Sequence, residues 1–229
     1  MRSHFEKDYP NLALSESAFM PDEQLYDWGV DVEAGWKRVQ EISRRTAKCS
    51  RNQMDENAWC HVVRLVLELA LDVASDLDNE FALEINNVQS QALKAAFLPR
   101  TSQLRLIDKK IDFTIAVDME KGSHFAVQPE LIPSSPMTDA YTERLPLLCG
   151  LEVKRHGGDQ VEAQLQLMVW QTAMLTYLDH LRQVGGNSDL PLPPVAGWIV
   201  IGHVWQFYIA RKEPGGDVII QSFSSIEPA

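Results

Sequence analysis

Two residues near the middle of the chain, Glu152 and Lys154, have types and a spacing that suit chemistry. They lie two positions apart in the apolar run Leu147–Lys154, and positions i and i+2 of a β-strand point to the same face. A carboxylate and an ammonium therefore leave an otherwise buried strand side by side. Charged groups are rarely buried unless they are paired or bind a metal, so this pair is a candidate site.

A further carboxylate, Asp112, lies in a second apolar segment, Lys110–Val117. Magnesium prefers a few carboxylates plus waters, and it can polarise a phosphoryl oxygen and generate hydroxide. Asp112 and Glu152 on neighbouring strands would supply two carboxylates, and the carbonyl of Val153 a further oxygen. Lys154 would hold or deprotonate the attacking water, or neutralise developing charge. This arrangement is typical of a metal-dependent phosphodiesterase, and the alternative is a plain ion pair in a strand hairpin.

Hydrophobic periodicity predicts the elements that must position these residues. Apolar residues at helical spacing predict three helices, over residues 31–48, 53–75 and 161–183. Apolar β-patterned runs predict strands within 81–97, 104–119, 147–154, 195–211 (two strands) and 218–223. Prolines and missing periodicity predict loops over 122–146 and 187–194. This order predicts an α/β domain with a mixed β-sheet flanked by helices.

The helix predicted over residues 161–183 carries glutamines on two stripes. Gln166 aligns with Trp170 and Tyr177 at four- and seven-residue spacing, so these side chains share one face of the helix. Gln164 and Gln171 lie on another stripe and are expected to be solvated. From the sequence pattern, one interpretation of Gln166 is a buried amide that bonds the backbone.

Length and composition favour one intracellular globular domain. The 229 residues and 45% apolar content suit a single domain over residues 31–229, preceded by a polar, partly ordered arm over residues 1–30. Three cysteines without a CxxC motif favour a reducing compartment. The N-terminus lacks an apolar signal segment, and no apolar run reaches the roughly 18 residues of a membrane span. We therefore expect a cytoplasmic or nuclear protein that is not secreted and has no membrane partner.

The charge distribution points in two directions. The net charge is −11, from 21 Lys and Arg against 32 Asp and Glu, which repels duplex DNA at long range. Residues 37–51, however, hold six basic side chains against Glu41 alone, a local charge of +5. This segment is either a basic face on an acidic body or a solvated helix face.

An ordered set of segments along the chain resembles the PD-(D/E)XK nuclease superfamily, and in particular the fungal PD-(D/E)XK nuclease-like domain proteins. The similarity covers about residues 30–210. The proline that gives the superfamily its name is absent before Asp112, where Ile111 stands. The matching segments are Glu56–Trp59, Lys110–Phe113, Tyr141–Pro146, Gly150–Lys154, Ala163–Trp170 and Gly202–Trp205.

The resemblance implies a restriction-endonuclease-like core with an N-terminal helical extension, and a nuclease site that binds one or two Mg²⁺ or Mn²⁺ ions. Asp112, Glu152 and Lys154 would form the catalytic set. Glu56 would bind metal directly or through water, or else act only as a first-turn acid that favours the helix dipole. Gln166 would contact the site or a substrate phosphate. DNA or RNA would be the partner.

Two other functions stay open, because fold does not fix function and this acidic chain has no evident attached nucleic-acid-binding domain. In the first, a nuclease fold serves as a metal-independent enzyme of a fungal biosynthetic pathway, with no cofactor. Asp112, Glu152 and Lys154 would then act as acid and base on a small organic substrate. In the second, the chain is a non-catalytic binding module.

Overall fold

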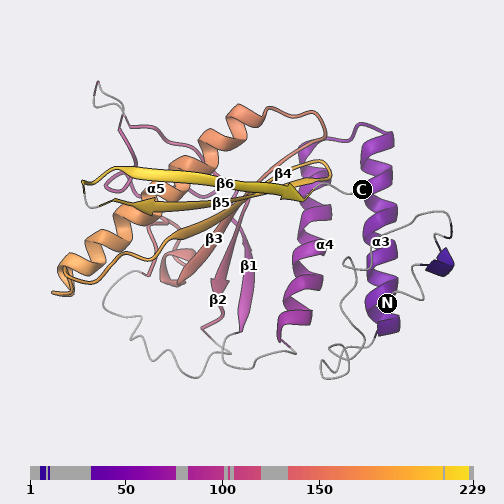
Figure 1. Ribbon diagram of the computed structural model, residues 1–229, viewed down its shortest axis with the longest axis horizontal. Coiled ribbons are helices and arrows are strands. Elements are labelled where there is room, and N and C mark those ends of the chain that lie inside the picture. Colours follow the sequence, from indigo (N-terminus) through magenta and orange to yellow (C-terminus); the bar gives the residue numbers. More distant parts are fainter. Residues whose placement is uncertain are drawn as a thin grey trace.

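The computed structural model describes residues 6–8, 10, 32–75, 82–100, 103, 106–119, 134–213 and 215–226. Most of the predicted N-terminal arm, residues 1–30, lies outside the described residues, and so does much of the predicted loop 122–146. The described residues form one sheet with helices on both faces (Figure 1).

The sheet has six strands arranged in sequence order. Neighbours pair antiparallel throughout, except that β3 and β4 are parallel. The mixed sheet predicted from the order of elements is therefore confirmed. The strands are β1 (Leu83–Asn87), β2 (Phe113–Val117), β3 (Leu147–Lys154), β4 (Val195–Ile201), β5 (Val204–Lys212) and β6 (Val218–Ile226).

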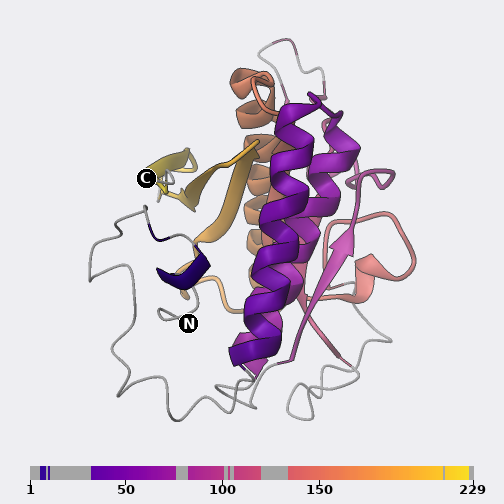
Figure 2. The same ribbon diagram turned by 90° about the vertical axis from the view of Figure 1, so that its right-hand side faces the viewer.

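The three predicted helices form: α4 (Glu56–Ser75) and α5 (Gln160–Val184) pack on the sheet, and α3 (Val32–Arg51) packs against α4. Helices α3 and α4 lie on one side of the sheet, and α5 lies on the other (Figures 1 and 2). Asp55 caps α4 by accepting the amide N–H of Ala58 at 3.1 Å, and Asp159 caps α5 by accepting that of Glu162 at 3.0 Å. A short 3-10 helix, η2 (Thr142–Arg144), precedes β3.

The two strand segments predicted before β3 are shorter than expected. Within 81–97, only Leu83–Asn87 forms a strand, and turns follow. Asp112 lies one residue before β2 rather than inside it. Its backbone is nevertheless held like that of a strand residue, because its N–H donates to the carbonyl of Leu151 at 3.0 Å and its own carbonyl accepts the N–H of Val88 at 2.9 Å.

Strand β3 forms the centre of the packed interior, and its alternation separates the core from the charged pair. Leu151 and Val153 are fully buried in the cluster shared with α4. On the opposite face, Gly150 lies against Trp170 of α5, and a Cβ at this position would come within 2.6 Å of the indole ring. Successive residues of a strand point to opposite faces, so the side chain of Glu152 projects from the face of the sheet that α5 covers.

Helix α3 carries the basic segment predicted at residues 37–51, and most of its charges are paired. Arg44 and Arg45 both contact Glu41, at 2.7 and 2.5 Å. Lys37 pairs with Glu33, and Arg38 with Asp72 of α4. The segment is thus largely a solvated helix face whose cations have acidic neighbours. No described helix is long and apolar enough to span a membrane.

Candidate metal centre

The site forms at the end of β3 that extends beyond its pairing with β2. The last pair between these strands joins Phe113 and Leu151, whereas β4 continues alongside β3 through Glu152 and Lys154. The end of β3 therefore has one open side. Asp112, the residue just before β2, fills this position, and its carboxylate Oδ2 accepts the backbone N–H of Val153 at 2.7 Å.

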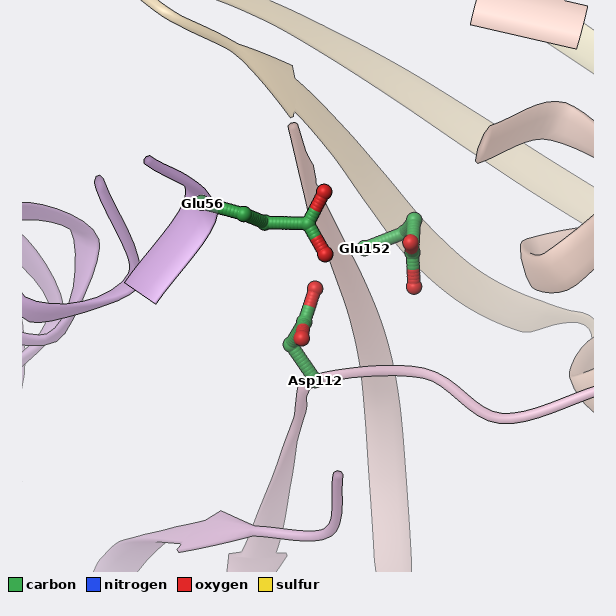
Figure 3. Close-up of side chains that lie close together, drawn as sticks. All are labelled: Glu56, Asp112 and Glu152. Atoms are coloured by element: carbon green, nitrogen blue, oxygen red, sulfur yellow. The ribbon is translucent and has the colours of Figure 1, made fainter. Parts of the chain in front are cut away.

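Three carboxylates meet at this opening. The oxygens of Glu56, Asp112 and Glu152 lie within 4.8 Å of one another, and Figure 3 shows the three side chains converging from α4, the start of β2 and β3. We call these three residues the carboxylate cluster. Asp112 and Glu152, predicted on adjacent strands with carboxylates close enough to share one ion, do lie together, and Glu56 joins them.

Glu56 reaches the cluster because it opens α4 at the same end of the sheet. Its side chain is 41% exposed, and its Oε2 lies 3.3 Å from Nζ of Lys154. Asp55 already caps the helix, so the Glu56 carboxylate is directed to the cluster and not needed as the cap. The Glu56 carboxylate thus lies beside the other two acids. Whether it binds a metal or serves only the helix dipole stays a prediction.

Lys154 is the cation of the site. Its Nζ lies 2.8 Å from Oε1 of Glu152, and its side chain is only 9% exposed. Burial opposes the charged ammonium, but the hydrogen bond and charge of Glu152 and the charge of Glu56 outweigh it, so the pKa of Lys154 is raised. Lys154 therefore stays protonated at neutral pH, which favours a charge-stabilising role over that of a base.

Glu152 is the most perturbed acid in the cluster. It is 1% exposed, and burial, followed by the charge of Asp112, raises its pKa from an ordinary 4.5 to about 8 despite the opposing ammonium of Lys154. Apart from that ion pair, neither carboxylate oxygen accepts a well-directed hydrogen bond from the described residues. Buried carboxylate oxygens left in this state are suited to a cation.

The donor set fits a hard divalent ion. Magnesium and manganese take oxygen ligands and keep several waters, and the cluster offers three carboxylates with one of them, Glu56, partly open to solvent. When all three are ionised, the cluster and Lys154 together carry a charge of −2, which a divalent ion would neutralise.

A residue that the sequence did not single out holds Asp112 in place. Nε2 of Gln89 donates to Oδ1 of Asp112 at 2.6 Å and lies 3.2 Å from Sγ of Cys60 on α4. Burial, and then the charge of Asp112, raise the pKa of the Cys60 thiol, so it stays neutral. Gln89 sits in the turn after β1, and no motif or periodicity marks it.

The predicted Gln166 lies near the site but not in it. Its Nε2 donates to the backbone carbonyl of Lys110 at 2.8 Å, two residues before Asp112, and its Oε1 is buried without a hydrogen-bond partner among the described residues. Gln166 thus supports the chain that leads to Asp112, which corresponds to the alternative of an amide bonded to backbone. A contact with substrate remains a prediction.

The two glutamines expected to be solvated are not. Gln171 is fully buried, and its Nε2 donates to the carbonyl of Val195 at 3.0 Å. Gln171 can be buried because Gly197, which faces it from β4, has no side chain. A Cβ at Gly197 would come within 3.0 Å of the Gln171 amide. Gln164 is half-buried and donates to the hydroxyl of Tyr208 at 3.1 Å.

Comparison with known families agrees with this geometry. The family model described as the PD-(D/E)XK nuclease superfamily matches residues 2–227, nearly the whole chain. The match includes all three carboxylates and Lys154. A search of curated proteins gives no match.

Proposed function

This chain belongs to the PD-(D/E)XK nuclease superfamily, and we propose that it hydrolyses phosphodiester bonds with the help of Mg²⁺ or Mn²⁺. The observation that carries the proposal is the gathering of the Glu56, Asp112 and Glu152 oxygens within 4.8 Å of one another. Lys154 lies beside two of these acids. A nucleic acid is the polymer that such a site would cleave.

The position of each residue in the site suggests its role. Glu56, Asp112 and Glu152 would hold the ion, and a bound ion of this kind supplies positive charge at the phosphoryl oxygen and lowers the pKa of water. Gln89 and the backbone N–H of Val153 fix both oxygens of Asp112. This pre-organisation keeps the cluster's geometry from relaxing when charge develops.

Lys154 would stabilise charge. Its raised pKa supports an ammonium that remains charged during the reaction, and its Nζ has a hydrogen available for a phosphate oxygen or the attacking water once Glu152 is engaged with an ion. Removing a charged donor of this kind from an active site typically costs about 10²- to 10³-fold in rate.

One observation favours a second function. Without a metal, the pKa of about 8 keeps Glu152 largely protonated at neutral pH, as a general acid requires. A metal-independent enzyme acting on a small organic substrate, with Glu152 as acid and Asp112 as base, would use this state. The two functions differ in what a divalent ion does to the protein.

The test combines cleavage with metal binding. Short single- and double-stranded DNA and RNA are incubated at low salt with Mg²⁺, with Mn²⁺ or with EDTA, and thermal unfolding is recorded with each ion. We expect cleavage and a higher unfolding temperature with metal only, and Asp112→Asn should lose both, since a ligand that binds only the folded state adds RT ln(1 + [L]/Kd) to its stability. A wild-type protein that neither cleaves nor responds to millimolar metal would reject the nuclease in favour of the metal-independent enzyme.

A further inference from the structure

The two edge strands of the sheet are protected differently. Strands β1 and β6 stand at the two ends of the strand order, so each pairs with one neighbouring strand among the described residues. β1 has five residues, and one of them is the charged Glu84, whose carboxylate accepts the hydroxyl of Tyr141 at 2.9 Å. A short strand that carries charge resists pairing with another chain. The β1 edge is therefore a poor template for a further strand.

β6 lacks both protections. Its nine residues, Val218–Ile226, include no Lys, Arg, Asp, Glu or Pro, although charged residues make up 23% of the chain. Its register with β5 is regular from Val218 to Phe223, and Figure 1 shows β6 as the outermost strand beyond β5. A regular, uncharged edge strand presents a row of backbone N–H and C=O groups to which another strand can bond.

The two faces of β6 differ in how far they are covered. Val218 and Ile220 pack against the core cluster that includes α5. The alternate residues Ile219 and Phe223 leave the opposite face and are 37% and 49% exposed. The occupant that suits this edge is therefore a strand that also covers these two apolar side chains.

A second copy of β6 meets this requirement by symmetry. Two identical antiparallel strands related by a twofold axis through the sheet must pair one residue with its own copy, because opposite residues share a face. When that residue is Gln221, Ile219 of each copy lies opposite Phe223 of the other. Centring the pair on either neighbouring residue would instead place Phe223 opposite a polar residue, Asp217 or Gln221.

Charge permits this contact although the chain as a whole is acidic. Two copies with a net charge of −11 repel each other, but repulsion between exposed charges is screened beyond about 8 Å at physiological salt. At the contact itself, residues 219–223 of one copy face residues 219–223 of the other, and none of them is charged. A second copy thus brings an uncharged, apolar edge to an uncharged, apolar edge.

We propose that the protein forms a twofold-symmetric dimer in which β6 pairs antiparallel with β6 of a second copy, centred on Gln221. This pairing joins the two sheets into one and occupies both β6 edges, so the assembly stops at two copies. The carboxylate cluster lies at β3, with β4 and β5 between it and β6. No residue of the cluster lies in the contact, and the proposal does not depend on cleavage.

Sedimentation velocity of the full chain over a micromolar concentration range at physiological salt measures the association. The main variant is Phe223→Lys, which changes two Ile219–Phe223 pairs at once because the contact is symmetric. The matched control is Gln183→Lys, which adds the same charge at an exposed residue near the end of α5. Circular dichroism checks that both variants keep the fold.

We expect the wild type to be a dimer. Phe223→Lys should raise the dissociation constant by roughly five-fold or more, because two apolar cross-strand pairs are lost, and Gln183→Lys should leave it unchanged. A wild type that stays monomeric, or that forms larger oligomers, would overturn the proposal. So would a dimer that Phe223→Lys leaves intact or that Gln183→Lys weakens equally.

A second pair of variants tests the register without removing an apolar side chain. Gln221→Lys places two ammonium groups opposite each other across the twofold axis, and Gln221→Glu places two carboxylates there, so each variant alone should dimerise less well than the wild type. Mixed together they should form the mixed dimer in preference to either homodimer, as measured by energy transfer between donor- and acceptor-labelled chains. Random mixing would refute the pairing centred on Gln221.

Discussion

Two clusters of charged side chains lie at opposite ends of α5 and differ in their charge balance. At the start of the helix, Lys154 is the single cation among the three acids of the carboxylate cluster. At the end, Asp179 is a single acid between two cations, with Arg182 and Lys212 each 2.7 Å from one of its oxygens. We call these last three residues the Asp179 cluster.

The pKa values record this difference. Burial and Asp112 raise the pKa of Glu152 to about 8, whereas the hydrogen bond from Lys212, and then that from Arg182, outweigh burial and lower the pKa of Asp179 below its ordinary 3.8. Both carboxylate oxygens of Asp179 accept a hydrogen bond from a cation of the Asp179 cluster, which therefore acts as a structural ion pair. The carboxylate cluster is under-neutralised, which is the condition expected of a site that awaits a cation.

The largest effect should come from removing the cation of each cluster. Lys154→Ala should lower metal-dependent cleavage by at least about 100-fold, because it removes the charged donor beside the carboxylates. Lys212→Ala removes a partly buried ammonium, 24% exposed, from the Asp179 cluster and should leave cleavage within about two-fold. Initial rates on a labelled oligonucleotide measure both.

A contaminating nuclease is the main rival explanation for any cleavage observed. It would give equal rates in the wild type and in Lys154→Ala preparations, so that result would withdraw the assignment of the site. Circular dichroism of Lys154→Ala should match the wild type, since the substitution removes no apolar core group.

The pairing of Glu152 with Lys154 could be predicted from the sequence because it is local. The run around Glu152 and Lys154 has the length and apolar content of a buried strand, and β3 spans the predicted residues 147–154. The paired spacing then fixes both charges on one face. Asp112 needed only that its own apolar run pair with β3. Their chemical roles remain predictions.

The supporting contacts could not be predicted, because they depend on packing between distant segments. Gln89 meets Asp112 across 23 residues of chain, through the turn after β1. Gln171 is buried because Gly197 leaves space for it, and helical spacing alone placed it in solvent. Periodicity indicates which face of an element is apolar, but not where an opposing glycine admits a polar side chain.

Glu152→Gln tests whether the excess negative charge of the carboxylate cluster destabilises the metal-free protein. The pKa of Glu152 is raised on folding, so the native state binds its proton more tightly and the free energy of unfolding falls as pH rises from about 4.5 to about 8. A glutamine carries no such charge, so the metal-free variant should be more stable than the wild type at pH 8.5. We expect its free energy of unfolding to be higher by at least about 1 kcal/mol, which corresponds to a rise in Tm of roughly 2–4 °C.

Urea titrations of both proteins in EDTA at pH 5 and pH 8.5 measure this gain, which should be much smaller at pH 5. Millimolar Mg²⁺ or Mn²⁺ should then stabilise the wild type at pH 8.5 and leave Glu152→Gln nearly unchanged. A variant less stable than the wild type at pH 8.5 without metal would show that Glu152 is well compensated, and the contrast with Asp179 would disappear.

Replacing Gln89 should have a smaller effect on the carboxylate cluster than replacing one of its acids. It donates to Asp112 and touches no other acid of the cluster by any described hydrogen bond. Gln89→Ala should weaken metal affinity by roughly 10-fold, as is typical when a partner of a metal ligand is lost. Calorimetric titration with Mn²⁺ measures the affinity. Gln171→Ala loses a buried glutamine that bonds the carbonyl of Val195 and no acid of the cluster, so it controls for general destabilisation. Equal losses in the two variants would make Gln89 merely structural.

The smallest effect should come from the Asp179 cluster, and its pH dependence should have the opposite sign to that of Glu152. The pKa of Asp179 is lowered on folding, so its ionised form stabilises the native state above the ordinary value of 3.8, and this contribution is lost as pH falls through the lower folded value. Asp179→Asn should therefore reduce stability by about 1 kcal/mol at pH 7, and the difference from the wild type should shrink below pH 3.8. Urea unfolding of both proteins between pH 3 and pH 7 measures this difference.

The stabilisation by Mn²⁺ should be the same in the wild type and in Asp179→Asn, because the unfavourable charge that a metal relieves lies at the other end of α5. A loss of the metal response in Asp179→Asn would mean that the two clusters are coupled through the helix and that charge balance alone does not distinguish them.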